Sequence, residues 1–375
     1  MRIVHIITSL SDGGAENILY KICQYDKLNE HIVISILNKG KYFSLLKKRG
    51  INVYCMNMRF YSLINFFVLI FLLRSLKPDI VQTWLIHGDI IGSIASRLAG
   101  IKNILWTVLY SKLDTSVEKK RNILLIKILA KLSNIFPKLV LVNSKSGKIN
   151  CLNLGYNKKK LKLIYFGIDL LNFKINDSEK KNFRKKNKIK KQTYLIASIA
   201  RFHPVKDHLN LLNALSIVRL KNKKFCCLLV GSGMNRKNKI LFDEIKRLKL
   251  ENNIKLLGNR NDISQIMNAI DVNILCSKSE GFPNVVVESM ACGTPCIVTN
   301  VGDSAYIVGK TGWVVPSQNS KKLATAIEKA LFKIGKKNWK EQCNQASSRV
   351  TNNFNILKRL KFYNSTLSKV YNKSY

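Results

Sequence analysis

Short apolar runs alternate with longer polar or amphipathic stretches along the whole chain. The runs are rich in Ile, Val and Leu and end at glycine or polar residues, so they predict buried β-strands separated by helices. The predicted strands are residues 1–8, 31–37, 51–56, 78–83, 104–108 and 139–144, and then 194–200, 225–230, 254–257, 271–276 and 295–299. Strands that alternate with helices are typical of parallel sheets, so the sequence predicts two successive Rossmann-like α/β arrays.

The most informative stretch is residues 276–299, CSKSEGFPNVVVESMACGTPCIVT. A strand ends there in a polar loop, a helix begins at Pro283 and Asn284, and Gly293 ends that helix. A helix that begins beside the carboxyl edge of a parallel sheet offers free N–H groups and a positive dipole end to an anion. Glu280 falls in the loop and Glu288 in the helix. Two acids at this edge indicate a binding site, although a helix cap and a solvated side chain would also explain them.

Basic and glycine residues follow other strands of the second half. Arg201 and Lys206 lie between the strand at 194–200 and the next helix, where an arginine fork and a lysine charge suit a diphosphate. Basic residues are so frequent here that the pair alone proves little. Gly231 follows the strand at 225–230, where it either lets the backbone approach a nucleotide closely or simply makes a turn.

Residues 280–283, Glu288 and residues 293–295 resemble the E-x7-E signature of the retaining, nucleotide-sugar-dependent glycosyltransferases of family 4, or group 1. Arg201 and Lys206 match the R-x4-K pattern of the same family. The resemblance implies a GT-B fold, in which two Rossmann-like domains face a cleft and the C-terminal helix crosses back to the first domain. The expected domains are residues 1–172 on the acceptor side, residues 173–355 for the nucleotide sugar, and the returning helix at 356–375.

The resemblance also implies roles for particular residues. Glu280 would face the transferred sugar, Glu288 would bind the ribose, and Arg201 and Lys206 would hold the pyrophosphate. The catalytic residues that we predict are Glu280, Arg201, Lys206 and His87, and the donor-binding residues are Gly14, Gly231, Gly281, Phe282, Asn284, Val285 and Glu288. No metal or other cofactor is expected.

The first half matches the family more loosely. His87 follows the strand at 78–83, ahead of a helix predicted at 90–99, and its segment resembles the acceptor-side loop of the family. A structural role is the alternative for a single histidine. Many members carry His or Arg just after the next strand, whereas this chain has Leu109. That departure leaves His87 or Asp89 as candidates for a base.

Two segments of the first half raise the question of membrane contact. Residues 60–73, FYSLINFFVLIFLL, are apolar nearly all round a predicted helix, but the run is shorter than the roughly 20 residues that cross a bilayer. It is either a core helix or one that docks on a membrane. Residues 121–136 predict a helix with Lys127 and Lys131 beside apolar residues, which suits an anionic membrane surface or a solvated face.

Charge and cysteine content bear on the binding partners and on the cellular compartment of the protein. The chain has 64 Lys and Arg against 22 Asp and Glu, a net charge of +42, which attracts nucleic acid, anionic lipid or phosphorylated substrates without choosing among them. Nine scattered cysteines have no zinc-binding spacing, and no secretory signal precedes them. We therefore expect reduced thiols, no structural metal, and a cytoplasmic protein that is peripheral on the inner face of the plasma membrane.

Together these features predict a retaining glycosyltransferase that uses a nucleoside-diphosphate sugar, with a UDP-sugar favoured. Its expected acceptor is a glycan or polyprenyl-linked molecule in bacterial surface polysaccharide or lipopolysaccharide synthesis. A nucleotide-sugar epimerase of the same fold is one alternative. A basic nucleic-acid binder is another, but it predicts aromatic residues among the lysine runs, and residues 180–191 contain only Phe183. No nucleic-acid partner is expected.

Overall fold

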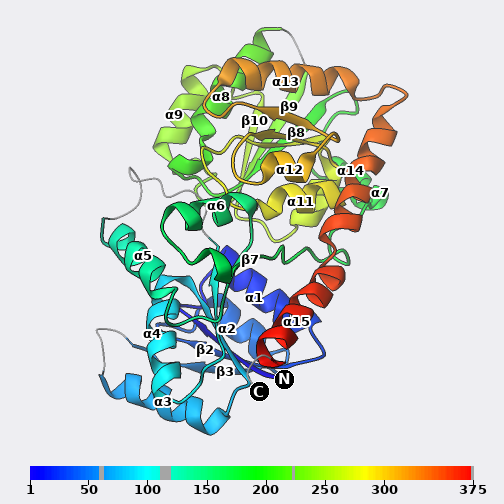
Figure 1. Ribbon diagram of the computed structural model, residues 1–375. Helices are drawn as coiled ribbons and strands as arrows, with labels where there is room; N and C mark the ends of the chain where they lie inside the picture. The colour runs from blue at the N-terminus through cyan, green and yellow to red at the C-terminus, as the bar shows by residue number, and fades with distance from the viewer. Residues whose placement is uncertain (59–62, 110–119, 222–223, 373–375) are drawn as a thin grey trace. The chain divides into compact units, whose positions relative to one another are not determined.

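A computed structural model describes residues 1–58, 63–109, 120–221 and 224–372, and it divides the chain into two compact units (Figure 1). Unit 1 comprises Met1–Gly167 and Ile356–Tyr375, and unit 2 comprises Ile168–Asn355. Each unit is built on a parallel sheet with helices on both faces. The predicted fold class is therefore confirmed, including the return of the C-terminal helix to the first unit.

The sheet of unit 1 has the strand order β3-β2-β1-β4-β5-β6-β7, and every pairing is parallel. Its strands are β1 Arg2–Ile7, β2 Glu30–Ser35, β3 Asn52–Cys55, β4 Ile80–Trp84, β5 Ile104–Val108, β6 Leu139–Val142 and β7 Leu161–Leu163. Its helices are α1 Gly14–Tyr25, α2 Gly40–Lys47, α3 Leu63–Leu76, α4 Leu85–Leu98, α5 Lys120–Leu132, α6 Lys145–Asn153, the 3₁₀ turn η1 Lys158–Lys160, and α15 Ile356–Asn372.

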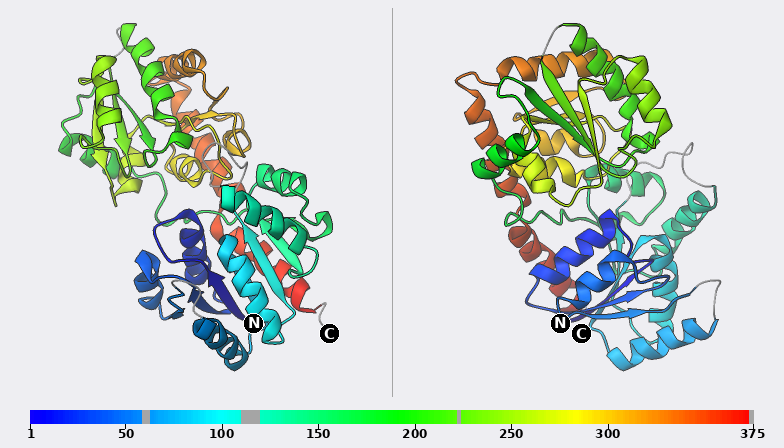
Figure 2. Two further views of the ribbon diagram at one scale, coloured as in Figure 1. Left: turned by 90° about the vertical axis from the view of Figure 1, so that its left-hand side faces the viewer. Right: turned by 180° about the vertical axis from the view of Figure 1, so that it is seen from behind.

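Successive side chains of β1 point to opposite faces of the sheet, and both faces are covered by helices. Ile3 and Ile7 point to one face, where they join a core formed with α1 and α15. Val4 and Ile6 point to the other face and pack with α3 and α4. Helix α15 lies beside α1 in Figures 1 and 2, so the last helix of the chain completes the core of the first unit.

The sheet of unit 2 has the strand order β10-β9-β8-β11-β12-β13, again with parallel pairings. Its strands are β8 Tyr194–Ile199, β9 Phe225–Val230, β10 Ile254–Gly258, β11 Val272–Leu275, β12 Cys296–Thr299 and β13 Trp313–Val315. Its helices are α7 Asp177–Lys186, the 3₁₀ turn η2 Pro204–Lys206, α8 His208–Leu220, α9 Lys239–Arg247, α10 Ile263–Ala269, α11 Asn284–Ala291, α12 Ser304–Val308, α13 Ser320–Lys333 and α14 Trp339–Phe354.

Helix α3 corrects part of the prediction for residues 60–73. Residues 60–62 lie outside the described residues, and the helix runs on to Leu76. Its buried residues are Leu69, Ile70 and Leu73, so core burial accounts for only one side of it. No helix in the described part of the chain is both long and apolar enough to cross a membrane.

A buried polar network ties α15 to the sheet of unit 1. Trp84 Nε1 donates to His5 Nδ1 at 3.3 Å, so the His5 proton lies on Nε2, which donates to His31 Nδ1 at 2.9 Å. His31 Nε2 then donates to Asp26 Oδ2 at 3.1 Å, and Asn364 of α15 donates to Asp26 Oδ1 at 3.0 Å. The indole N–H can only donate, and it therefore sets the direction of the hydrogen bonds along this chain of side chains.

His5, Cys23 and His31 are the one group within the described residues whose side chains are close enough to share a metal ion. The group does not fit a metal, because the ring nitrogens are engaged in the hydrogen bonds just described. Burial also raises the pKa of the Cys23 thiol, whereas a metal ligand must be a thiolate. We assign the group to packing. All nine cysteines are free thiols.

Candidate active site

The loops after β8, β9, β11 and β12 meet at the carboxyl edge of the sheet in unit 2. They meet because parallel strands end at the same edge. Backbone hydrogen bonds join them: Phe202 N to Ser232 O at 2.7 Å, Lys278 N to Val205 O at 2.7 Å, and Asp303 N to Gly281 O at 2.9 Å. Most of the predicted site residues lie on these loops or at the start of α11.

Lys206 and Glu280 form an ion pair at the centre of this edge. Lys206 ends η2, Glu280 lies between β11 and α11, and Lys206 Nζ is 2.5 Å from Glu280 Oε1. Ser277 Oγ donates to the same oxygen at 2.5 Å. The side chains are 24% and 11% exposed, so the pair is partly open to solvent. Ser277 was missed as a site residue, although its position three residues before the acid was visible in the sequence.

Arg201 and Gly231 lie where the first two loops of unit 2 converge. Arg201 follows β8, is exposed, and has no ion-pair partner among the described residues. Gly231 has φ +136°, and a Cβ atom there would lie 2.3 Å from the carbonyl oxygen of Ala200. The two loops can approach each other only if residue 231 is a glycine. Loop packing, the alternative to nucleotide contact, is therefore enough to explain this glycine.

The start of α11 confirms the predicted helix boundary. Asn284 is the first helical residue, and Pro283 provides no side-chain cap, so backbone N–H groups remain available at this end. Glu280 does not cap the helix, because its hydrogen bonds go to Lys206 and Ser277. The helix-cap alternative for Glu280 is therefore wrong.

The neighbouring donor-side residues are held by loop contacts. Gly281 accepts the hydrogen bond from Asp303, and a Cβ atom on Gly302 would lie 2.3 Å from the Glu280 carbonyl oxygen. Phe282 packs edge-on against Phe354 with ring centroids 5.3 Å apart. Two further predicted residues, Val285 and Glu288, are half-buried on α11.

His208 is buried directly behind the Lys206 turn. Its ring stacks on Phe202 with centroids 5.8 Å apart, and neither ring nitrogen has a hydrogen-bond partner within the described residues. Burial, followed by the positive charge of Lys206, lowers the pKa of His208 to about 4. A neutral imidazole is therefore built into the wall of the site.

We expect the stability of unit 2 to fall with acidification, because the unfolded chain binds a proton at His208 that the folded chain does not. A histidine whose pKa drops from 6.5 to about 4 weakens folding by about 2 kcal/mol at pH 5 relative to neutral pH. Denaturant unfolding should show this loss below pH 6.5 in the wild-type protein. In His208→Leu the loss of stability on acidification should be smaller by the same amount. An unchanged pH dependence in this variant would show that His208 is not the group responsible.

The two remaining predicted residues, His87 and Gly14, lie in unit 1. His87 lies in the first turn of α4, not in a loop before a helix at 90–99, because α4 begins at Leu85. Burial, and then the charge of Arg121, lower the pKa of His87. Gly14 begins α1, and a Cβ atom there would meet no atom within 4 Å, so the packing of the chain does not require a glycine.

Asp89 is not an accessible base. It is 2% exposed, and Thr83 Oγ1 donates to its Oδ1 at 2.5 Å. Burial raises the pKa of this carboxyl well above its ordinary value. The prediction that Asp89 could replace a missing base is therefore wrong, and His87 is the candidate that remains on this segment.

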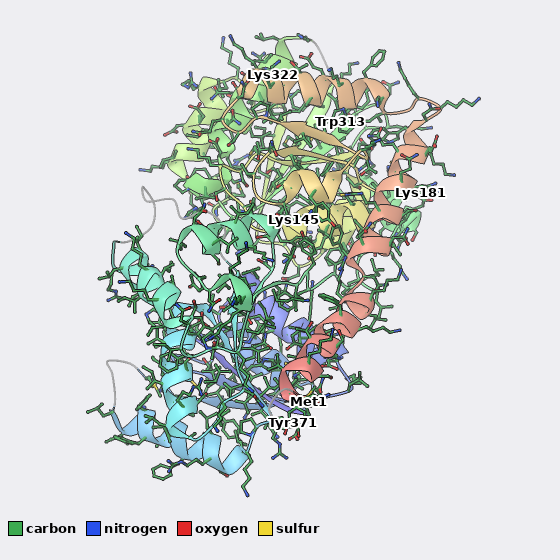
Figure 3. The ribbon with its side chains drawn as sticks, in the orientation of Figure 1. Met1, Lys145, Lys181, Trp313, Lys322 and Tyr371 are labelled. Atoms are coloured by element: carbon green, nitrogen blue, oxygen red, sulfur yellow. The ribbon has the colours of Figure 1, made fainter. Side chains whose placement is uncertain are left out.

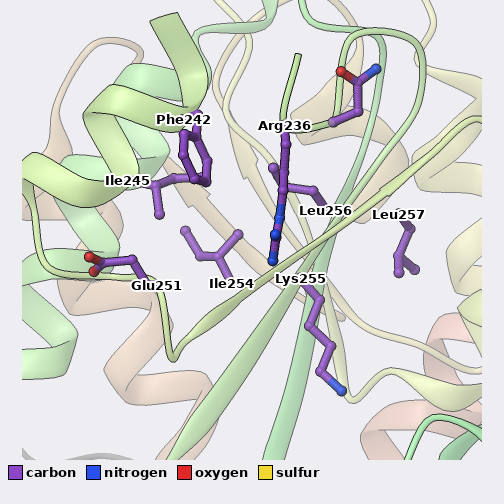
Figure 4. Close-up of a pocket in the computed structure, with 9 residues that line it drawn as sticks. Arg236, Phe242, Ile245, Glu251, Ile254, Lys255, Leu256 and Leu257 are labelled. Atoms are coloured by element: carbon purple, nitrogen blue, oxygen red, sulfur yellow. The ribbon is translucent and has the colours of Figure 1, made fainter. Parts of the chain in front are cut away.

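A pocket of about 710 Å³ lies elsewhere in unit 2, at the edge strand β10 (Figure 4). Phe242 and Ile245 of α9 and Ile254 and Leu256 of β10 form apolar walls, and Arg236 extends between them. None of the predicted site residues lines it. The pocket is therefore separate from the loops that hold Lys206 and Glu280.

Positive charge is not concentrated at the site. Basic side chains are distributed over both units, as Lys145, Lys181 and Lys322 illustrate in Figure 3. The net charge therefore does not locate a ligand, and the position of Arg201 and Lys206 between strand and helix is more informative than their charge.

Two parallel-sheet units joined by a returning C-terminal helix define the GT-B class of glycosyltransferase fold. The chain is similar to the crystal structure of Anabaena HepE in complex with UDP and glucose, with a TM-score of 0.86 and 25% identity over 98% of this chain and 100% of that one. It also matches the lipopolysaccharide outer core galactosyltransferase WaaB, with a TM-score of 0.72 and 14% identity over 98% and 100% of the chains.

Sequence comparison points in the same direction. Residues 179–346, which lie within unit 2, match the family described as "Glycosyl transferases group 1". It is 27% identical over 304 residues to the UDP-Gal:alpha-D-GlcNAc-diphosphoundecaprenol alpha-1,3-galactosyltransferase of Escherichia coli, covering 77% of this chain and 75% of that one. It is 23% identical over 316 residues to the capsular polysaccharide biosynthesis glycosyltransferase CapH of Staphylococcus aureus, covering 82% and 83%. The chain is a glycosyltransferase, as predicted.

Proposed function

We propose that this protein transfers a sugar from a UDP-sugar to a lipid-linked glycan acceptor, with retention of configuration at the anomeric carbon, as a member of glycosyltransferase family 4. The acceptor class is a polyprenyl diphosphate that carries a growing glycan of a bacterial surface polysaccharide or lipopolysaccharide. The reaction takes place on the inner face of the plasma membrane and needs no metal.

The observation that carries the proposal is the contact between Lys206 and Glu280. A sugar diphosphate carries its negative charge on the phosphates and its hydroxyls on the adjacent ring. A lysine and a carboxylate 2.5 Å apart match these two neighbouring parts of one donor. Arg201 and the uncapped start of α11 lie on the same edge of the sheet and add positive charge beside the phosphates.

These groups favour a mechanism based on stabilising the leaving group. The bond between the anomeric carbon and the diphosphate oxygen breaks, and Lys206 and Arg201 neutralise the charge that develops on that oxygen. The acceptor oxygen attacks from the same face and gives its proton to the departing phosphate. A double displacement would need a carboxylate nucleophile about 5 Å from a second acid. Glu280 is paired with Lys206, and we assign it to the sugar hydroxyls.

The remaining assignments follow the family motif. Glu288 of α11 binds the ribose, while Gly231, Gly281, Phe282, Asn284 and Val285 surround the diphosphate. For the two residues of unit 1, we assign Gly14 to the donor and His87 to the acceptor.

The printed descriptions of similar proteins support the choice of donor and acceptor. HepE was crystallised with UDP and with UDP-glucose. The Escherichia coli relative uses UDP-Gal and a sugar-diphosphoundecaprenol, and a Campylobacter jejuni relative, 25% identical over 78% of this chain, also acts on a diphospho-undecaprenol acceptor. A UDP-sugar and a polyprenyl-linked acceptor are therefore the first pair to test.

The test is a donor screen followed by product analysis. UDP-, GDP- and ADP-sugars are compared by thermal shift, and the best donor is incubated with a glycosyl diphosphoundecaprenol. We expect a UDP-sugar to give the largest shift and the proton NMR spectrum to show an α-linked product from an α-linked donor. An inverted product would exclude retention. A new sugar isomer formed without acceptor would favour the epimerase alternative.

A further inference from the structure

Helix α3 of unit 1 has a broad apolar face that no residue in the described part of the chain covers. Leu63, Ile64, Phe67, Val68 and Phe71 are between 47 and 75% exposed. Their spacing of i, i+1, i+4, i+5 and i+8 places them on one side of the helix, opposite the buried residues. Isolated exposed hydrophobic residues are ordinary, but five large ones on one helix face form a patch of the kind that marks a binding surface.

Exposed apolar residues are also found on the next two helices of the same layer. Helix α4 packs against α3 on one side and α5 on the other, and Figure 1 shows the three helices on one side of unit 1. Exposed apolar residues also occur on α4 and α5, namely Ile94, Leu98, Leu124 and Ile128. The three helices therefore present a common surface, which we call the α3–α5 face.

Among the described residues of α3, α4 and α5, the exposed charged side chains are all basic. Helices α3 and α5 contain no acidic residue, and the only acid of α4 is the buried Asp89. The exposed basic residues are Arg74, Arg97, Arg121, Lys127 and Lys131. Basic side chains around an exposed apolar patch match a surface of anionic headgroups above acyl chains.

We propose that the α3–α5 face docks unit 1 on an anionic lipid bilayer, with α3 lying in the membrane interface. Helix α3 has 14 residues and a length of about 21 Å, which is too short for a hydrocarbon core of about 30 Å. It is attached along its length through Leu69, Ile70 and Leu73, so it enters the headgroup region sideways with its exposed side chains toward the acyl chains. Docking concerns unit 1 alone and does not depend on the proposed donor site.

A second copy of the chain is a poorer occupant of this face. A symmetric dimer would place the same patch on both subunits and bring the basic residues of the two copies together with no exposed acid on the three helices to balance them. Anionic lipid supplies the missing negative charge. The charge pattern therefore favours a bilayer over self-association.

The test measures co-sedimentation of the full chain with vesicles in the absence of donor and acceptor. We expect binding to vesicles of phosphatidylglycerol and phosphatidylcholine, and much weaker binding to phosphatidylcholine alone or at high salt. The triple variant Ile64→Gln, Phe67→Gln, Phe71→Gln should bind at least about tenfold more weakly. A variant with Lys127→Gln and Lys131→Gln should bind less and lose part of the salt dependence.

A matched control removes three exposed apolar residues from elsewhere, Leu28→Gln, Ile240→Gln and Phe332→Gln, and should bind as the wild type does. Circular dichroism and thermal melting check that each variant is folded. Equal binding by the α3 variant and the wild type overturns the proposal, as does equal binding to neutral vesicles. Light scattering that shows a dimer which the α3 variant dissociates would assign the face to self-association instead. Failure of transfer with intact vesicle binding would count only against the proposed function.

Discussion

Replacement of Lys206 by alanine should reduce kcat/KM for glycosyl transfer by about a hundredfold to a thousandfold, which is the usual effect of removing one preorganised group that stabilises developing charge. The variant should remain folded, since Glu280 keeps its hydrogen bond from Ser277 and the lysine is partly exposed. Affinity for UDP alone should fall as well, because the lysine is assigned to the diphosphate. Steady-state kinetics and calorimetric titration with UDP measure the two effects.

The matched control is Lys221→Ala. Lys221 lies in the same unit and forms an ion pair of similar length, 2.8 Å to Glu328, but that pair is exposed. Lys221 also follows the last residue of α8, at the opposite end of the helix from the Lys206 turn. It should show wild-type kinetics. Full activity in Lys206→Ala would remove the diphosphate assignment, and equal losses in both lysine variants would indicate a general effect on stability or charge.

Replacement of Glu280 by glutamine should lower kcat by about a hundredfold while leaving the affinity for UDP unchanged or slightly increased. The reason is that Glu280 is assigned to the sugar, and removing its negative charge frees Lys206 for the phosphates. The two variants should therefore differ in UDP binding even though both lose transfer. Titration with UDP and with a UDP-sugar separates them.

Glu328→Gln serves as the control for this second variant, because it removes the acid of the surface pair. We expect no change in its kinetics. A large loss of UDP affinity in Glu280→Gln would show that the carboxylate contacts the nucleotide and not the sugar. Normal turnover would exclude Glu280 from the reaction altogether.

Much of the fold was predictable because buried parallel strands leave a strong signal in the sequence. Residues 104–108 and 225–230 were predicted with the bounds that β5 and β9 have. The strands that were missed, β7 and β13, have three residues each and lie at the outer edges of their sheets. An edge strand has one paired neighbour, so it is shorter and carries a weaker apolar pattern.

The loops were harder to predict than the strands. The motif placed Lys206 and Glu280 in one site, but it did not indicate that they pair or that Ser277 shares the carboxylate, since such contacts depend on side-chain rotamers and loop geometry. The helix that contains His87 begins at Leu85, earlier than expected, and Leu85 has a left-handed φ of 68° that no sequence rule favours for leucine. Periodicity also could not separate core burial from membrane docking for α3, because its apolar residues surround the helix.

The discontinuity of unit 1 has a consequence for synthesis on the ribosome. Residues 168–355 form a complete unit and emerge before α15, so unit 2 can finish folding while unit 1 still lacks its last helix. Until α15 is translated, the sheet surface that Leu360, Tyr363 and Leu367 later cover is exposed, and the carboxylate of Asp26 lacks its amide partner from Asn364. Chaperones are expected to bind the incomplete first unit at this stage. Premature termination within α15 should therefore destabilise unit 1 far more than the loss of so few residues suggests.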